Sequence, residues 1–166
     1  EWSHVIEKLE GKTQAELENW FLGNSTHVID LAFYLGGEPK DIATFHSGKN
    51  NLKWHPVSSN YSGAGLTTNG ALFSYHADWT APGRFSVEIM TKKHRLIFRP
   101  LEKLQIQNIG SVAINMVDGI DYTLDELYKP GLYLQTKCFL ENDVSRFCRL
   151  SDQARRMQLY KKMSGL

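Results

Sequence analysis

The sequence has few cysteines and no long apolar run, and both absences narrow the class of protein. Cys138 and Cys148 are the only cysteines among 166 residues and form no Cys-x-x-Cys pair, so neither a disulfide scaffold nor a zinc knuckle is indicated. No apolar stretch reaches the roughly 18 residues that a membrane span requires, and no charged-then-apolar leader is present. We therefore expect a cytoplasmic protein with reduced thiols that does not enter the membrane.

Strong charge of either sign is also absent. The formal net charge is +1, with 42% apolar and 22% charged residues, which excludes disorder and gives no field that would select nucleic acid. Basic residues outnumber acids from Lys129 to Leu166, but they stand at helical spacing between apolar residues, which is typical of a solvated helix face. We expect one globular domain over residues 1–166.

Several motifs that carry chemistry are missing. Gly63 and Gly65 begin a Gly-x-Gly-x-x-Gly pattern, but position 68 is Thr, so this chain lacks the usual dinucleotide fingerprint. There is likewise no P-loop, no His-Glu-x-x-His and no Gly-x-Ser-x-Gly, and the six histidines show no metal-ligand spacing. The sequence predicts no metal site.

The first part of the chain predicts two helices and a long loop. Residues 13–22 have Thr13 as a candidate N-cap and Glu16 to complete a capping box. Residues 25–35 predict a helix buried on nearly every side, which Gly36-Gly37 ends. A short strand at 42–46 precedes residues 47–70, which are rich in Gly, Ser and Asn and predict a functional loop or lid.

From residue 71 to 117 apolar and polar side chains alternate with a period of two, which predicts an antiparallel meander of about five strands. Tyr133–Leu140 and Ser151–Met163 then read as closing helices, the second capped by Ser151. The expected fold is α+β, with an open, mainly antiparallel sheet of about five or more strands and helices packed on one face.

Four polar residues of the predicted buried helix share one side. Asn24, His27, Asp30 and Tyr34 stand three or four positions apart. Because a buried polar side chain is costly unless it is hydrogen-bonded, this stripe requires a partner, which is either protein or substrate. Asn24 and Ser25 either cap the helix or point into a pocket, and capping is the favoured interpretation.

The segment from Asn24 to Pro39, Asn-Ser-Thr-His-Val-Ile-Asp-Leu-Ala-Phe-Tyr-Leu-Gly-Gly-Glu-Pro, resembles the His-x-x-Asp helix of the Gfo/Idh/MocA oxidoreductases. The following meander, the helix start at Lys129-Pro130-Gly131 and the last amphipathic helix resemble the order of elements in that family's C-terminal domain. The resemblance implies a C-terminal half that works with an N-terminal Rossmann domain, which holds NAD or NADP. The start at Glu1 without Met agrees with this expectation.

The resemblance also implies an activity, the oxidation of a sugar or polyol. His27 would be the catalytic acid/base, a task that histidine as a residue type suits because its reference pKa, about 6.5, lies near working pH. Asp30 is expected to pair with a neighbour or to contact substrate, and Asn24 to contact substrate if it does not cap. An aspartate often stands four residues before the family's histidine, whereas this chain has Gly23 there.

Three further residues are candidates for substrate binding. Trp54 and His55, within the predicted loop, either cover a sugar ring or belong to a plain surface loop. His76 lies on a polar strand face with Ser74 and Asp78, and this face is solvent-exposed, a subunit interface or the floor of the site.

The open sheet predicts a homo-oligomer, because an exposed apolar sheet face is otherwise an aggregation hazard. Trp79, Phe85 and Met90 offer large side chains for one face or the other. Two alternatives to the dehydrogenase remain open. One is a non-enzymatic dimerisation or ligand-binding module on the same fold, and the other is a stand-alone lyase or isomerase.

Overall fold

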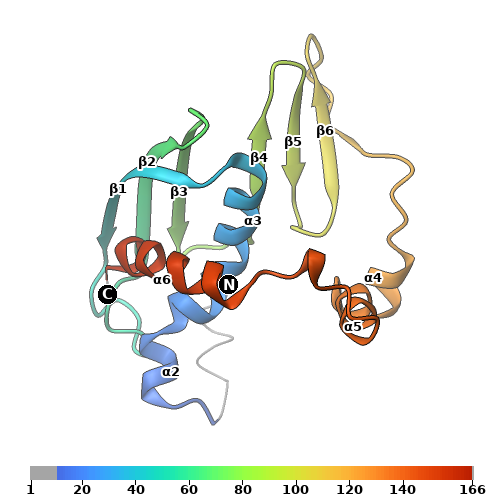
Figure 1. The fold of residues 1–166 in the computed structure, drawn as a ribbon. Helices are drawn as coiled ribbons and strands as arrows, with labels where there is room; N and C mark the ends of the chain where they lie inside the picture. The colour runs from blue at the N-terminus through green and yellow to red at the C-terminus, as the bar shows by residue number, and fades with distance from the viewer. Residues whose placement is uncertain (1–10, 166) are drawn as a thin grey trace. The chain divides into compact units, whose positions relative to one another are not determined.

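The computed structural model describes residues 11–165, which form two compact units (Figure 1). The first unit comprises the residues up to Phe85 together with those from Arg155 onward, and the second runs from Ser86 to Ala154. Helical segments precede and follow an uninterrupted run of antiparallel strands, which confirms the α+β class. The strands form two sheets, ordered β1-β2-β3 and β4-β5-β6-β7, where the sequence predicted one continuous meander.

The first described helix begins as the sequence predicts. α2 (Gln14–Glu18) has a complete capping box, in which the Glu16 amide donates to Thr13 Oγ1 at 3.2 Å and the Thr13 amide donates to Glu16 Oε2 at 2.8 Å. The helix is shorter than the predicted range 13–22. A π-helical turn, η1 (Phe21–Ser25), takes up the remaining residues.

α3 (Thr26–Gly36) follows η1 without a break, and the Gly37 amide donates to the Phe33 carbonyl at 3.0 Å. Gly37 has φ +100°, a backbone conformation that favours glycine and ends the helix as predicted. Only Ile29 and Phe33 of α3 are buried. The prediction of burial on nearly every side is wrong, because in a two-layer unit a helix covers the sheet with one side only.

The sheet of the first unit contains a strand that the sequence did not predict. β1 (Pro39–Ser47), β2 (Asn60–Thr67) and β3 (Leu72–Asp78) pair antiparallel, so β2 occupies part of the predicted loop 47–70. Its Gly and Ala residues have low strand propensity, which hid the strand. A Cβ on Gly63 would lie 2.4 Å from Tyr75 Cε1 and 2.5 Å from the Ala43 carbonyl oxygen, so glycine admits the Tyr75 ring across the strand.

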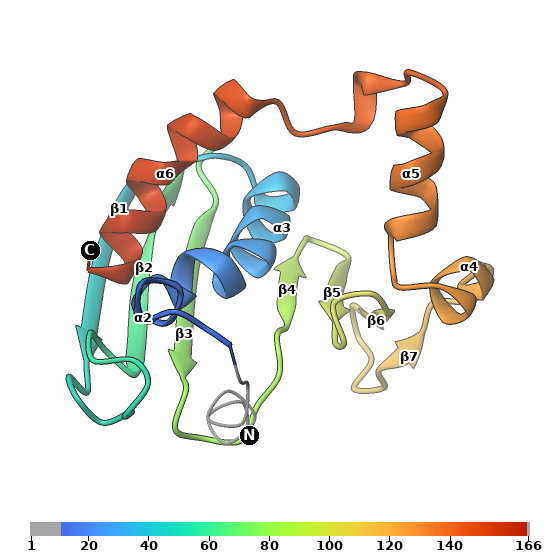
Figure 2. The same ribbon diagram turned by 90° about the horizontal axis from the view of Figure 1, so that it is seen from below.

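α3 and α6 (Leu150–Ser164) cover the same face of this sheet (Figure 2). Their contact forms a core of buried side chains from η1, α3, β2 and α6: Phe21, Ile29, Phe33, Tyr61, Tyr160 and Met163. The last helix is confirmed, but the Asp152 amide already bonds to the Arg149 carbonyl at 2.9 Å. Ser151 therefore lies within the first turn and is not the predicted N-cap.

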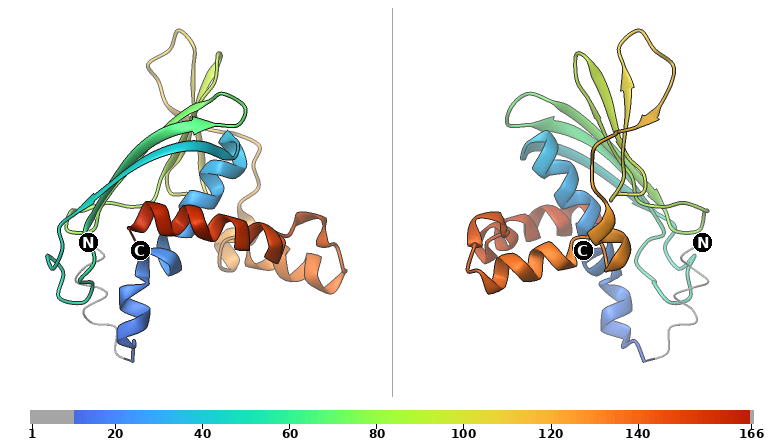
Figure 3. Two further views of the ribbon diagram at one scale, coloured as in Figure 1. Left: turned by 60° about the vertical axis from the view of Figure 1, so that its left-hand side comes forward. Right: turned by 90° about the vertical axis from the view of Figure 1, so that its right-hand side faces the viewer.

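The second unit carries the other sheet and three short helical segments. Figure 3 shows its strands as neighbouring yellow-green to yellow arrows. The elements are β4 (Val87–Met90), β5 (His94–Phe98), β6 (Leu104–Asn108), β7 (Asn115–Met116), α4 (Thr123–Leu127), α5 (Leu132–Leu140) and η2 (Val144–Arg146). α5 begins one residue earlier than predicted, and α4 was not predicted. Within residues 11–165, no helix combines the length and apolar character that crossing a membrane requires.

Candidate functional site

His27 lies on the first turn of α3, directly after the π-helical turn η1. Its side chain is exposed. Across residues 11–165 it makes neither a hydrogen bond nor an ion pair. π-Helical turns occur frequently at functional sites, which makes this end of α3 the first candidate for chemistry.

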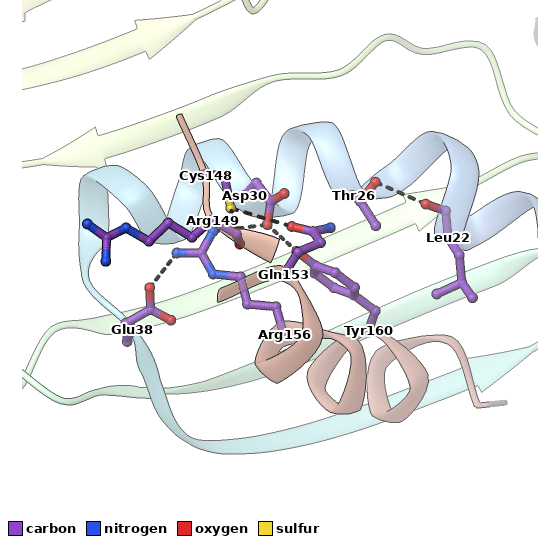
Figure 4. A network of polar contacts seen from close by, with 9 residues as sticks. All are labelled: Leu22, Thr26, Asp30, Glu38, Cys148, Arg149, Gln153, Arg156 and Tyr160. Carbon is purple, nitrogen blue, oxygen red and sulfur yellow. Dashed lines mark hydrogen bonds and ion pairs between the residues drawn. The ribbon is translucent and has the colours of Figure 1, made fainter. Parts of the chain in front are cut away.

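Asp30, one turn further along α3, is held by α6 (Figure 4). Arg156 Nη1 donates to Asp30 Oδ1 at 3.1 Å, and the Tyr160 hydroxyl donates to the same oxygen. Arg156 Nη2 also pairs with Glu38, at the end of the turn between α3 and β1. The partner that the sequence required for Asp30 is therefore protein, and its carboxylate anchors α3 to α6.

The charges in this network reinforce one another. Burial lowers the pKa of Arg156, but the hydrogen bonds and charges of Glu38 and Asp30 raise it by more, so the guanidinium stays charged. A charged hydrogen bond from Arg is stronger than a neutral one. The result is a fixed helix from which His27 projects one turn before the anchor.

Asn24 is half-buried in η1, and Ser25 is buried. Neither side chain caps α3, because η1 runs directly into it and leaves no free helix start; the position before α3 makes no side-chain cap hydrogen bond. The capping interpretation is therefore wrong for both residues. Asn24 stays a predicted substrate contact on the same helical segment as His27.

Trp54 and His55 belong to the core and not to a surface loop. They are 7% and 1% exposed. Trp54 stacks on Trp79 with ring centroids 5.8 Å apart and planes at 14°, and it meets Trp20 edge-on. This burial corrects both predicted interpretations, since rings packed against other rings leave no face for a sugar. The cluster exists because β3 brings Trp79 to a segment that the sequence alone presents as irregular.

His55 is tied to two other elements. Its Nδ1 lies 2.7 Å from the Leu17 carbonyl oxygen, which can only accept, so Nδ1 carries a proton. Its Nε2 lies 3.1 Å from the oxygen of the Tyr61 hydroxyl, and that hydroxyl donates to the Ser58 carbonyl at 3.0 Å. Burial lowers the pKa of His55, against the smaller opposing effects of the Leu17 hydrogen bond and the Glu18 charge.

We expect this burial to make folding stability depend on pH. The unfolded histidine has a pKa near 6.5 and the folded one a lower value, so the unfolded state binds more protons between the two values. The stability that the buried, neutral imidazole contributes is complete above the pKa of the unfolded state. It is lost as the pH falls from there through the pKa of the folded state. Urea unfolding between about pH 5 and 8 should show a free energy of unfolding that rises with pH in the parent, and that rises less steeply in His55→Gln.

His76→Gln is the matched control, because His76 is exposed. Its free energy of unfolding should depend on pH as steeply as that of the parent. Equal slopes in the parent and in His55→Gln would show that the buried imidazole does not cause the effect.

His76 lies on β3 opposite Ser62 of β2. Its neighbours Tyr75 and Ala77 pack against the core, so His76 stands on the other, exposed face of the sheet. The sheet therefore separates it from α3. Of the predicted site residues, the structure keeps only Asn24, His27 and Asp30 together.

Sequence reasoning missed Arg156, Tyr160 and Glu38. Arg156 and Tyr160 stand four apart on α6 and so share a side. That spacing was the one available sign that the two residues act together. It does not identify Asp30 as their partner, more than a hundred positions away in the sequence.

A shallow hollow of about 660 Å³ in the first unit is lined by residues of β1, β2, β3 and α6, including Lys40, Phe73 and Lys162. None of the predicted site residues lines it. Gly63 and Gly65 also do not fit the phosphates of a dinucleotide. Gly63 and Gly65 lie within the paired strand β2 and not in a turn at a helix start, where amides are free to bind phosphate.

Among residues 11–165, no group of three or more His, Cys, Asp or Glu side chains is placed to hold a metal ion. Comparison with known proteins gave no match, whether to family models, to curated proteins or to solved structures.

Proposed function

We propose that this chain is the substrate-binding and catalytic-base half of a cytoplasmic NAD(P)-dependent dehydrogenase that acts on a sugar or polyol. The observation that supports this best is the contrast between two residues of α3. Asp30 is fixed by Arg156 and Tyr160, while His27, one turn earlier, is exposed and free of protein partners within the described residues. A histidine presented on an anchored helix suits proton transfer, which needs a fixed distance to the substrate.

In this proposal His27 accepts the proton of a secondary hydroxyl group through one ring nitrogen. Asp30 acts as a positioning residue, because it holds α3 and does not touch the substrate. Asn24 contacts the substrate from the adjoining turn. NAD or NADP, held by an N-terminal Rossmann domain, would take the hydride.

The test is the activity of the two-domain protein. The sequence preceding Glu1 should contain a glycine-rich dinucleotide fingerprint, and the two domains together should reduce NAD or NADP with a sugar or polyol from a panel. The isolated chain is the matched control and should reduce neither nucleotide, because hydride transfer needs the nicotinamide within about 3.5 Å of the substrate carbon. No reduction with any substrate, or no fingerprint before Glu1, would contradict the proposal.

The second candidate is a dimerisation module, and one observation favours it. The sheet of the first unit exposes the face opposite α3 and α6, with Phe45 69% and Leu72 85% exposed. We call this the outer face; its exposed side chains are Ala43, Phe45, Ser62, Ala64, Leu72, Ser74 and His76. Large exposed apolar side chains among small ones suit contact with another flat surface. Trp79 does not contribute, because it packs in the core.

We therefore expect self-association through the outer face. Sedimentation of the full chain should show dimers or larger species. Leu72→Lys should raise the Kd of the dimer roughly ten-fold, which corresponds to about the free energy of one buried apolar contact. Met90→Lys is the control, since Met90 is equally exposed but lies on β4 of the second unit. A clean monomer at high concentration would rule out association through this face.

A further inference from the structure

Both cysteines of the chain line one small hollow in the second unit. The hollow measures about 310 Å³ and lies between α5 and the segment that follows η2, with Leu134, Arg146 and Phe147 among the residues around Cys138 and Cys148. The two thiols come from positions ten apart in the sequence. They are not part of the proposed dehydrogenase site.

The backbone brings the thiols together by reversing direction after α5. The Asp143 amide donates to the Cys138 carbonyl at 2.9 Å, and Asn142 has φ +56°. Asp143 Oδ1 then accepts from the Ser145 amide at 3.2 Å and starts η2. Residues 139–147 thus form a closed turn that returns Cys148 to the side of α5.

The two thiols differ in access. Cys138 is half-buried and Cys148 is exposed. Cys148 Sγ lies 3.7 Å from Gln153 Oε1 and 3.7 Å from the Arg149 carbonyl oxygen. Neither contact covers the sulfur, so an oxidant in solution reaches Cys148 first.

Little packing opposes a movement of this turn. No side chain from Lys129 to Ala154 is buried, and Leu140 and Val144, on the turn, are both exposed. A disulfide needs Cα atoms within about 7 Å, and few apolar contacts oppose a shift of this segment that closes the hollow.

We propose that Cys148 and Cys138 form a reversible disulfide by exchange with a small-molecule disulfide. The Cys148 thiolate attacks one sulfur of the small disulfide, which forms a mixed disulfide and releases one small thiol. The Cys138 thiolate then attacks Cys148 Sγ and releases the second small thiol. The two protein thiols lose two electrons and two protons, and the small disulfide gains them. In a reducing compartment such a bond is transient, which makes it a redox-responsive modification.

The experiment uses the full chain, reduced and then exposed to oxidised glutathione. Intact mass spectrometry should show one product that is two hydrogen atoms lighter than the reduced chain and carries no glutathione, and a dithiol reductant should reverse it. Trypsin cuts after Lys137, Arg146 and Arg149, which places the two cysteines on separate peptides. Without reductant these two peptides should appear as one linked species.

Three variants serve as controls. In Cys138→Ser and in Cys148→Ser the exchange reaction should stop at the mixed disulfide, a chain that carries one glutathione. A third variant, Cys148→Ser with Ser151→Cys, moves the exposed thiol from the hollow to the first turn of α6. This variant should form its intramolecular disulfide at least ten-fold more slowly than the parent, because only a thiol at position 148 faces Cys138 across the hollow.

Several outcomes would overturn the proposal. These are a parent chain that ends with two glutathiones, one that stays fully reduced while free glutathione is oxidised, and one that forms a disulfide between two chains. Equal closure in the moved-thiol variant would also overturn it, because the hollow would then have no role. None of these results bears on nicotinamide reduction, so the two proposals fail independently.

Discussion

Replacing His27 with alanine in the two-domain protein should lower kcat by about 10²- to 10⁴-fold, the usual contribution of general acid–base catalysis. KM should change little, since the proton moves only in the transition state and substrate binding is shared with other groups. The fold should not suffer, because the His27 side chain is exposed and contacts no described residue through a hydrogen bond or ion pair. Steady-state kinetics with the best substrate of the panel measures both constants.

Two further measurements separate proton transfer from a merely structural effect. Added imidazole should restore part of the activity of His27→Ala, because a small base can enter the space that the side chain vacates. His76→Ala should keep the parent's kcat, since His76 stands on the other face of the sheet. An unchanged kcat in His27→Ala would remove this residue from catalysis.

The largest loss of stability should follow from Tyr160→Ala. Tyr160 is 0% exposed and lies in the core that joins α6, α3 and β2. Truncating a fully buried aromatic side chain costs about 3–5 kcal/mol, and here the Asp30 carboxylate also loses a hydrogen-bond donor. Urea unfolding should show this loss, and Tm should fall by roughly ten degrees.

Two substitutions divide this loss into its parts. Tyr160→Phe keeps the ring and removes the donor to Asp30, so it should cost about 1–2 kcal/mol. Tyr34→Ala, at an exposed position of α3, should stay within about 0.5 kcal/mol of the parent. If Tyr160→Phe were as damaging as Tyr160→Ala, the hydrogen bond and not the packing of the ring would hold the two helices together.

Local features of the fold could be predicted from the sequence where neighbouring residues decide them. The capping box of Thr13 and Glu16 and the helix end at Gly37 depend on atoms a few positions apart, and both are confirmed. The alternation in 72–78 likewise became a strand, because a period of two is a property of the chain itself. β2 was missed because glycine and alanine in a strand carry no such signal. The two glycines are explained by the rings on the paired strand, Tyr75 against Gly63 and Phe73 against Gly65.

The candidate site was predicted in part. Asn24, His27 and Asp30 share one helical segment, since helical spacing alone places them there. The structure does not bring Trp54, His55 and His76 to this segment. Their positions depend on which strands pair and on the face of the sheet from which each side chain projects. Sequence spacing contains neither of these facts.

The sequence by itself determined that the chain mixes helices with antiparallel strands, and it singled out the helix of His27 and Asp30. The tertiary structure decided what each polar residue meets. Asp30 meets Arg156 and Tyr160 from the far end of the chain, and His55 meets Leu17 and Tyr61 in the core. The physical reason is range, because capping, turns and periodicity act over a few residues, whereas burial and ion pairing are set by elements that come together only on folding.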